Sequence, residues 1–543
     1  MRKLITKLLC ICMAVVMVTA TLTGCEKSKE DSKEDSKEEI SNMSATPEEA
    51  DGTYSSDDTY NLVEMEKNQV TGGTNTEDYN TEEYNTIVES SFKSAKDYPM
   101  STFSVDVDTA SYSNIRRMIN NGGEVVPDAV RVEEMINYFK YDYSKPTGDT
   151  PFSVNTELSE CPWNENAKLL LIGLQAKDID LVDRPNSNLV FLLDVSGSMY
   201  SEDKLPLMQK AFIMLTENLN ENDRISIVTY AGMEKVVLEG ARGDETMKIV
   251  GALEELSAGG STAGAAGITK AYELAEEYYI EGGNNRVILA TDGDLNVGIT
   301  SEGDLTRLIE NKRENGVYLS VLGFGTGNIK DNKMETLADN GNGNYSYIDS
   351  FLEAKKVLVE EMGGTLFTVA KDVKLQVEFN PAYIKGYRLI GYENRMLNTE
   401  DFNDDTKDAG EIGAGHRVTA LYELIESSSK QEVPESDLKY QSEGTLSDSK
   451  EWLTINIRYK EPDQDISQLL SVVVDESNYT SIMPENLLFA SSVAAFGMLL
   501  RDSQWKGTAS YQMILDNLSN QDLLEDVYKD EFISIVKKMN RIG

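Results

Sequence analysis

Three oxygen-bearing side chains stand at every second position in the stretch Asp194-Val195-Ser196-Gly197-Ser198. Residues two apart can turn their side chains the same way in a tight loop, and Gly197 allows the bend. One carboxylate and two hydroxyls form an oxygen-only donor set, which suits hard cations such as Mg²⁺, Ca²⁺ or Mn²⁺. Alone, this spacing is a weak indication of a metal site, because serine and aspartate also cap helices and turns.

Two further loops carry side chains that would complete such a site. The stretch G-G-S-T ends at Thr262, just before a helix predicted over residues 265–279. The stretch T-D-G contains Asp292 and follows a strand predicted over residues 287–290. Thr262 would add a third hydroxyl, and Asp292 a second carboxylate. Three such stretches in this order favour a metal site over unrelated caps and turns.

These loops must be positioned by secondary structure. Between residues 186 and 365 the sequence predicts strands and helices in alternation. The apolar run 189–193 is typical of a strand buried on both faces. Further strands are predicted over residues 225–230, 287–290, 317–324 and from 345, and helices over 205–219, 265–279, 305–314 and up to 362. This alternation predicts an α/β fold with a doubly wound, mainly parallel sheet. Such sheets bind ligands at the carboxyl ends of their strands, where Asp194 and Asp292 stand.

The three stretches together resemble the metal-ion-dependent adhesion site of von Willebrand factor type A domains, which have a Rossmann-like fold. The resemblance implies that Ser196, Ser198 and Thr262 offer hydroxyl oxygens to a divalent cation. It also implies that Asp194 and Asp292 act on that cation directly or through water. All five positions match the pattern. The expected cation is Mg²⁺, with Ca²⁺ or Mn²⁺ possible.

Segments outside the α/β region extend the resemblance over nearly all residues after 100. The stretch S-T-F-S-V-D-V-D-T-A-S-Y (101–112), the segment 151–163 and the segment 408–416 resemble the flanks of a bacterial lipoprotein family built around this domain. That family implies a metal-dependent binding module at the cell envelope. It implies no settled catalytic role.

The first residues have the layout of an export signal. Basic side chains precede an apolar run over residues 8–18, which is short for a span that must cross about 30 Å of hydrocarbon with roughly 20 residues. Leu22-Thr23-Gly24-Cys25 resembles the lipobox of bacterial lipoproteins, so residues 1–24 are predicted to be removed and Cys25 to carry lipid such as palmitate. The alternative is an uncleaved signal anchor with a chance cysteine. We expect a lipid-anchored protein on the extracytoplasmic face of the cell membrane.

Composition divides the rest of the chain. Residues 25–95 are polar, acidic and without apolar periodicity, which predicts a disordered stalk. An α+β flanking domain is expected over 96–185, the type A domain over 186–365, a β-rich region over 366–480 and a helical region over 481–543. A formal net charge of −42 argues against nucleic acid as a partner.

Histidine and cysteine limit the possible chemistry. His416 is the sole histidine, which excludes His-rich zinc sites and leaves Ser-His-Asp or Cys-His catalysis nearly untenable. After signal removal and acylation only Cys161 remains, so no internal disulfide is expected.

The sequence therefore favours a binding protein, not an enzyme, that captures an acidic residue of a protein partner through its bound cation. One alternative is a metal-dependent hydrolase, which would need a general base beside the metal. Another is a solute-binding lipoprotein, which would need a cleft between two similar lobes.

Overall fold

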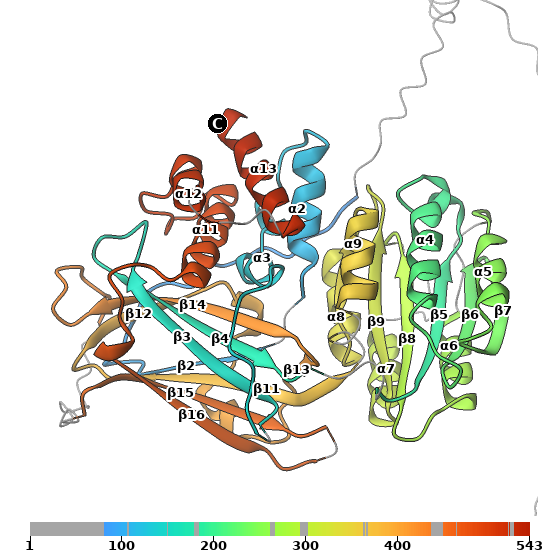
Figure 1. Cartoon of the computed structure of the whole chain (residues 1–543), viewed down its shortest axis with the longest axis horizontal. Coiled ribbons are helices and arrows are strands. Elements are labelled where there is room, and N and C mark those ends of the chain that lie inside the picture. The colour runs from blue at the N-terminus through green and yellow to red at the C-terminus, as the bar shows by residue number, and fades with distance from the viewer. Residues whose placement is uncertain are drawn as a thin grey trace, which may run out of the picture. The chain divides into compact units, whose positions relative to one another are not determined.

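The structure is a computed structural model (Figure 1). It describes residues 81–542 except 106–107, 149, 179–183, 261–266, 294–301, 362–363, 365–366, 436–448, 463, 520 and 522–525. The predicted export signal, Cys25 and Thr262 lie outside the described residues, as does most of the predicted stalk.

A six-stranded sheet forms the centre of the α/β region, in the order β10-β9-β8-β5-β6-β7. Neighbouring strands are parallel except for the β6–β7 pair. The strands are β5 (Ser187–Asp194), β6 (Arg224–Ala231), β7 (Met233–Arg242), β8 (Asn284–Thr291), β9 (Val317–Phe324) and β10 (Tyr345–Ile348). The predicted α/β fold with a mainly parallel sheet is confirmed. Strand β7 is an antiparallel edge strand that the sequence pattern did not indicate.

Helices cover both faces of this sheet (Figure 1). Leu189, Phe191 and Leu193 of β5 pack into one core with α4, α5 and α9, whereas Val190 and Leu192 pack into another with α6, α7 and α8. The helices are α4 (Leu205–Thr216), α5 (Thr246–Glu254), α6 (Gly267–Glu277), α7 (Glu302–Glu314), α8 (Asp331–Asn340) and α9 (Phe351–Lys355). Successive side chains of a strand point to opposite faces, so burial on both sides explains the unbroken apolar run.

Residues 81–95 belong to the folded region, although their polar composition predicts stalk. The N–H of Thr81 donates to the carbonyl of Gly327 at 2.8 Å, and that of Glu83 donates to the carbonyl of Ile329 at 3.0 Å. Three ion pairs add to these contacts: Glu82–Arg117, Glu83–Lys330 and Glu89–Arg501. Backbone hydrogen bonds, ion pairs and the buried side chains of Phe92 and Ala95 hold this segment. These two apolar residues form no periodic pattern, so periodicity could not reveal it. The predicted stalk boundary at residue 95 is too late.

The regions before and after the α/β region share two antiparallel sheets (Figure 1). One has the order β1-β12-β14-β4-β3, and the other β13-β11-β15-β16 with β2 paired to β11. The strands are β1 (Lys93–Ser94), β2 (Met100–Ser104), β3 (Phe152–Glu160), β4 (Lys168–Ala176), β11 (Thr368–Phe379), β12 (Ile384–Ile390), β13 (Gly410–Gly413), β14 (Arg417–Glu426), β15 (Glu451–Lys460) and β16 (Gln468–Asp475). Leu170 and Ile172 of one sheet share a core with Leu375 and Ile455 of the other. The flanking regions that were expected as separate domains thus form one sandwich, with the α/β region inserted between β4 and β11.

Five helices pack on the outer face of the first of these sheets. Their core includes Leu169 and Leu171 of β4, which point away from the sandwich interior. The helices are α2 (Ala110–Asn120), α3 (Val132–Asn137), α11 (Glu485–Leu500), α12 (Tyr511–Leu518) and α13 (Val527–Ile542). Helix α11 is largely buried, as expected for an apolar core helix. Among the described residues, no helix combines the length and apolar character needed to cross a membrane.

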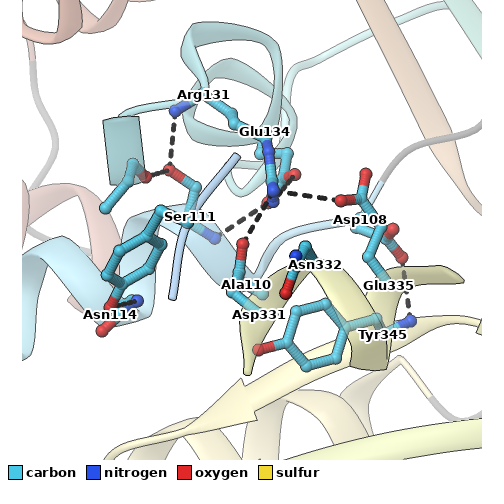
Figure 2. Close-up of polar contacts among 12 residues, drawn as sticks. Asp108, Ala110, Ser111, Asn114, Arg131, Glu134, Asp331, Asn332, Glu335 and Tyr345 are labelled. Carbon is cyan, nitrogen blue, oxygen red and sulfur yellow. Dashed lines mark hydrogen bonds and ion pairs between the residues drawn. The ribbon is translucent and has the colours of Figure 1, made fainter. Parts of the chain in front are cut away.

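A buried cluster of charged side chains joins the α/β region to the sandwich (Figure 2). Arg131 lies 2.7 Å from Asp331 and 3.0 Å from Glu335, both on α8. Arg395 lies 2.7 Å from Asp339 on the same helix. The α8 cluster comprises Asp108, Arg131, Glu134, Asp331, Glu335, Asp339 and Arg395. Burial raises the pKa of Glu335 to about 8, so a retained proton offsets part of the excess negative charge.

Candidate metal centre

Asp194 is the last residue of β5, and its side chain is fully buried. The N–H of Ser196 donates to its Oδ1 at 2.8 Å, which closes a turn of the kind aspartate favours. The hydroxyl of Thr291, at the end of β8, donates to its Oδ2 at 3.4 Å. Strands β5 and β8 are parallel neighbours, so their carboxyl ends meet at one edge and fix this carboxylate between two loops.

The two serines turn their hydroxyls toward each other, as their spacing predicts. Ser196 Oγ lies 2.9 Å from Ser198 Oγ, at the start of a short 3₁₀ helix (Gly197–Tyr200). Ser196 is buried and Ser198 is exposed. The pair therefore runs from the buried carboxylate of Asp194 to the surface, and a cation held there would be reachable from solvent.

The G-G-S-T stretch begins beside this loop. The N–H of Gly197 donates to the carbonyl of Gly260 at 3.2 Å, and the N–H of Gly259 donates to the carbonyl of Val195 at 2.9 Å. Thr262 itself lies outside the described residues, so its predicted hydroxyl ligand stays a prediction. Gly259 and Gly260, which begin that stretch, lie beside the loop after β5, as the predicted site requires.

Asp292 follows β8 and is also buried. Its Oδ2 lies 2.7 Å from Nζ of Lys204, the residue just before α4, and 3.4 Å from Nδ2 of Asn328. We call the loops after β5, β8 and β9, with Asp194, Ser196, Ser198, Asp292 and Lys204, the metal edge. The motifs in the sequence did not point to Lys204 or Asn328. For Lys204 one sign was available: it is a positively charged residue at the N-terminal end of a predicted helix, where the helix dipole disfavours positive charge.

Tyr230 is affected by both carboxylates. It stands in register with Asp194, one residue before the end of β6, and its side chain is buried. Burial, together with the charges of Asp194 and Asp292, raises the pKa of its hydroxyl well above the ordinary value. A second positive charge in addition to Lys204 would relieve this concentration of negative charge.

The donor set fits a hard divalent cation. It offers two carboxylates and two hydroxyls, all oxygen, at one end of parallel strands. Within the described ranges, no group of three or more His, Cys, Asp or Glu side chains is arranged to hold a metal ion. A centre at the metal edge would therefore depend on its hydroxyls as much as on its carboxylates.

Exposed apolar side chains stand beside the metal edge. Tyr200 closes the 3₁₀ helix that contains Ser198, and 83% of its surface is exposed. Met233 begins β7 after the turn that follows β6, and 79% of its surface is exposed. Gly260 lies against Ala231 of that turn, which places Met233 near the same loops.

The remaining candidate reactive groups lie in the flanking regions, where Cys161 is buried and His416 is half-buried. Burial lowers the pKa of His416 and raises that of Cys161 well above its ordinary value. The Cys161 thiol lies 3.6 Å from a carboxylate oxygen of Glu423, whose charge acts in the same direction. A thiol held in its protonated form is a poor nucleophile.

Comparison with known proteins agrees with this architecture. Residues 188–360 match the family model of the von Willebrand factor type A domain, and residues 78–171 match one described as von Willebrand factor. Residues 364–542 match one described as the C-terminal region of the uncharacterized protein YfbK. Type A domains generally bind a divalent cation and commonly mediate protein–protein interactions.

Individual relatives cover different shares of the chain. The uncharacterized protein YfbK of Escherichia coli K12 is 44% identical over 454 residues, which are 81% of this chain and 78% of that protein. An uncharacterized Synechocystis protein is 30% identical over 191 residues, 34% of this chain and 43% of that protein. A solved von Willebrand factor type A structure from Catenulispora acidiphila has 17% identity and a TM-score of 0.40, covering 74% of this chain and 91% of that one. The chain belongs to the family of the E. coli protein YfbK, and its von Willebrand factor type A domain stands between N- and C-terminal flanks that match family models of their own.

Proposed function

We propose that this chain is a lipid-anchored, extracytoplasmic binding protein that captures an acidic side chain of a protein partner through a divalent cation. Asp194, Ser196, Ser198, Thr262 and Asp292 would hold the cation, with Mg²⁺ preferred. The observation that supports this most is the pairing of the buried Asp194 and Ser196 with the exposed Ser198 at the same strand end.

The donor set explains why a partner should be acidic. Mg²⁺ favours six oxygen ligands and usually keeps several waters when a protein supplies only one or two carboxylates. Hydroxyls donate less charge than carboxylates, so the bound cation would supply a positive centre that attracts another carboxylate. Contacts between opposite charges of fixed geometry give specificity. The exposed Tyr200 and Met233 would contact apolar side chains next to the acidic residue of the partner.

A binding role agrees with the titratable groups at the metal edge better than hydrolysis does. A hydrolase needs a general base beside the metal. Of the described groups here, Asp194 and Asp292 are candidate ligands, Lys204 is paired with Asp292, and Tyr230 is kept neutral by its raised pKa. Neither Lys204 nor Tyr230 is therefore the base that hydrolysis requires.

The lipid anchor is proposed from Cys25 and the sequence around it. Metabolic labelling with a palmitate analogue, followed by membrane fractionation, tests the anchor. We expect label and membrane association in the wild type and loss of both in Cys25→Ser. Membrane association that persists in the Cys25→Ser protein would instead support an uncleaved signal anchor.

The cation and the partner are tested with the soluble chain lacking the signal. We expect calorimetric binding of Mn²⁺ or Mg²⁺ in the wild type and in the surface control Asp304→Ala, but not in Asp194→Ala. A partner cross-linked at the cell surface should be lost after chelation and in Asp194→Ala. Capture that survives both treatments would refute the proposal, and metal-dependent turnover of peptide, phosphate or glycan substrates would favour the hydrolase.

A further inference from the structure

The metal edge contains a positive side chain that the predicted ligand pattern does not include. Lys204 Nζ lies 2.7 Å from Asp292 Oδ2, and the two side chains are 8% and 0% exposed. Buried ion pairs interact much more strongly than exposed ones, because little water screens them. Any cation that binds through Asp292 must share this carboxylate with Lys204.

The local structure is shaped to keep the lysine there. Lys204 stands at the N-cap position of α4, where short polar side chains are favoured and a positive charge opposes the helix dipole. Its aliphatic stem crosses Gly325, just after β9, at the place where a Cβ atom on residue 325 would overlap it. An unfavourable helix cap and a glycine at residue 325 are therefore both present here. Together they allow the ammonium group of Lys204 to reach Asp292.

Counting charges shows what the lysine does to the site. Asp194 and Asp292 together carry two negative charges, which a divalent cation alone would neutralise. With Lys204 present, the same cation leaves one positive charge in excess beside two buried carboxylates. Unbalanced buried charge is unfavourable. An incoming carboxylate would restore neutrality.

We propose that Lys204 couples the two binding events at the metal edge, so that the cation binds weakly alone and tightly when an external carboxylate binds with it. The proposal rests on the proposed metal site and adds its regulation. Coupling between two ligands is reciprocal, so the cation strengthens carboxylate binding by the same factor. The protein would then hold its cation firmly only when a partner is engaged.

The test measures Mn²⁺ affinity by titration calorimetry, with and without saturating acetate as the carboxylate probe. The variants are Lys204→Met, which keeps the length of the side chain, and Lys204→Gln, which keeps a hydrogen-bond donor without charge. Lys210→Met, on the exposed side of α4, is the matched control. Thermal unfolding establishes that each protein is folded, and Lys204→Gln carries the test if Lys204→Met is not.

Without acetate, we expect the neutral variants to bind Mn²⁺ at least tenfold more tightly than the wild type and Lys210→Met. Acetate should raise the affinity of the wild type severalfold and that of the variants much less. Unchanged or weaker Mn²⁺ binding in a folded variant, or the same acetate effect in all proteins, would overturn the coupling alone. Absence of Mn²⁺ binding by the wild type both with and without acetate would overturn the proposed metal site as well.

Discussion

The metal edge and the α8 cluster both bury several carboxylates, but they balance the charge differently. In the α8 cluster, Arg131 and Arg395 each contact more than one carboxylate, and Glu335 has a raised pKa. At the metal edge, Lys204 contacts Asp292, and exposed Ser198 leaves the site open to solvent. In the first region, two arginines and a retained proton offset part of the negative charge, and the ion pairs join two parts of the fold. The second leaves part of its charge to be balanced by ions and ligands from outside.

The comparison predicts the largest loss of stability in the α8 cluster. Arg131→Ala should lower the free energy of unfolding by about 3–5 kcal/mol, because it leaves buried carboxylates without their partner. Urea unfolding measures this value. Arg307→Ala, whose side chain is 70% exposed, is the control and should change stability by less than about 0.5 kcal/mol. A small loss for Arg131→Ala would show that the cluster is not balanced internally.

At the metal edge, the matching substitution should affect binding and not folding. Asp194→Asn keeps the shape of the side chain and should weaken Mn²⁺ binding at least a hundredfold, about 2.7 kcal/mol. In EDTA, its stability should equal or exceed that of the wild type, because one buried charge of a like-charged pair is gone. Calorimetry and urea unfolding measure the two effects. A large loss of stability in EDTA would mean that Asp194 has a structural role.

The next largest expected difference between the two regions is in how their proton binding makes stability depend on pH. Glu335 has a pKa of about 8 in the folded protein, against an ordinary value of 4.5. The folded state therefore holds a proton that the unfolded state releases, so this contribution is complete below about pH 4.5 and is lost as pH rises to about 8. One such group changes the free energy of unfolding by at most about 1.4 kcal/mol per pH unit.

Urea unfolding in EDTA across pH 5 to 8 measures this loss. Glu335→Gln should reduce the slope. It should not remove the slope completely, because Glu133, whose pKa is raised to about 7 by burial and nearby carboxylates, acts in the same direction. Equal slopes in the wild type and in Glu335→Gln would contradict the protonated state of Glu335.

The smallest effect is expected at the rim of the metal edge. Tyr200→Ala should weaken partner binding roughly threefold to tenfold through lost apolar contact. Cation affinity and stability should stay unchanged, because the side chain is 83% exposed. Surface plasmon resonance with the cross-linked partner and Mn²⁺ calorimetry measure the two quantities. A matching loss of Mn²⁺ affinity would place Tyr200 in the site itself.

Local patterns predicted where two loops of the metal edge lie. Asp194 and Asp292 could be placed because each follows an apolar strand directly, and parallel strands bring such positions to one edge. Strand β9, over Val317–Phe324, was predicted with the same bounds. In both cases the signal lies within a few consecutive residues.

The missing features depend on contacts between distant residues. Strand β2 pairs with β11, so Phe103 lies opposite Leu375, and nothing local specifies that partner. For this reason the two flanking regions read as separate domains. Lys204 was missed because its partner Asp292 is 88 residues away. The helix predicted over 205–219 ends at Thr216, since periodicity alone marks helix ends poorly.

The hydrogen bonds of Thr81 and Glu83 give the molecule a mechanical property. They join the N-terminal end of the folded region to the loop 327–330, and Asn328 of that loop contacts Asp292. Tension applied along the chain from its N-terminal side would load these bonds before it reaches the strand pairing of β1 with β12. A pull between residue 81 and a partner held at the metal edge would therefore act over a short path, through the loop that touches Asp292.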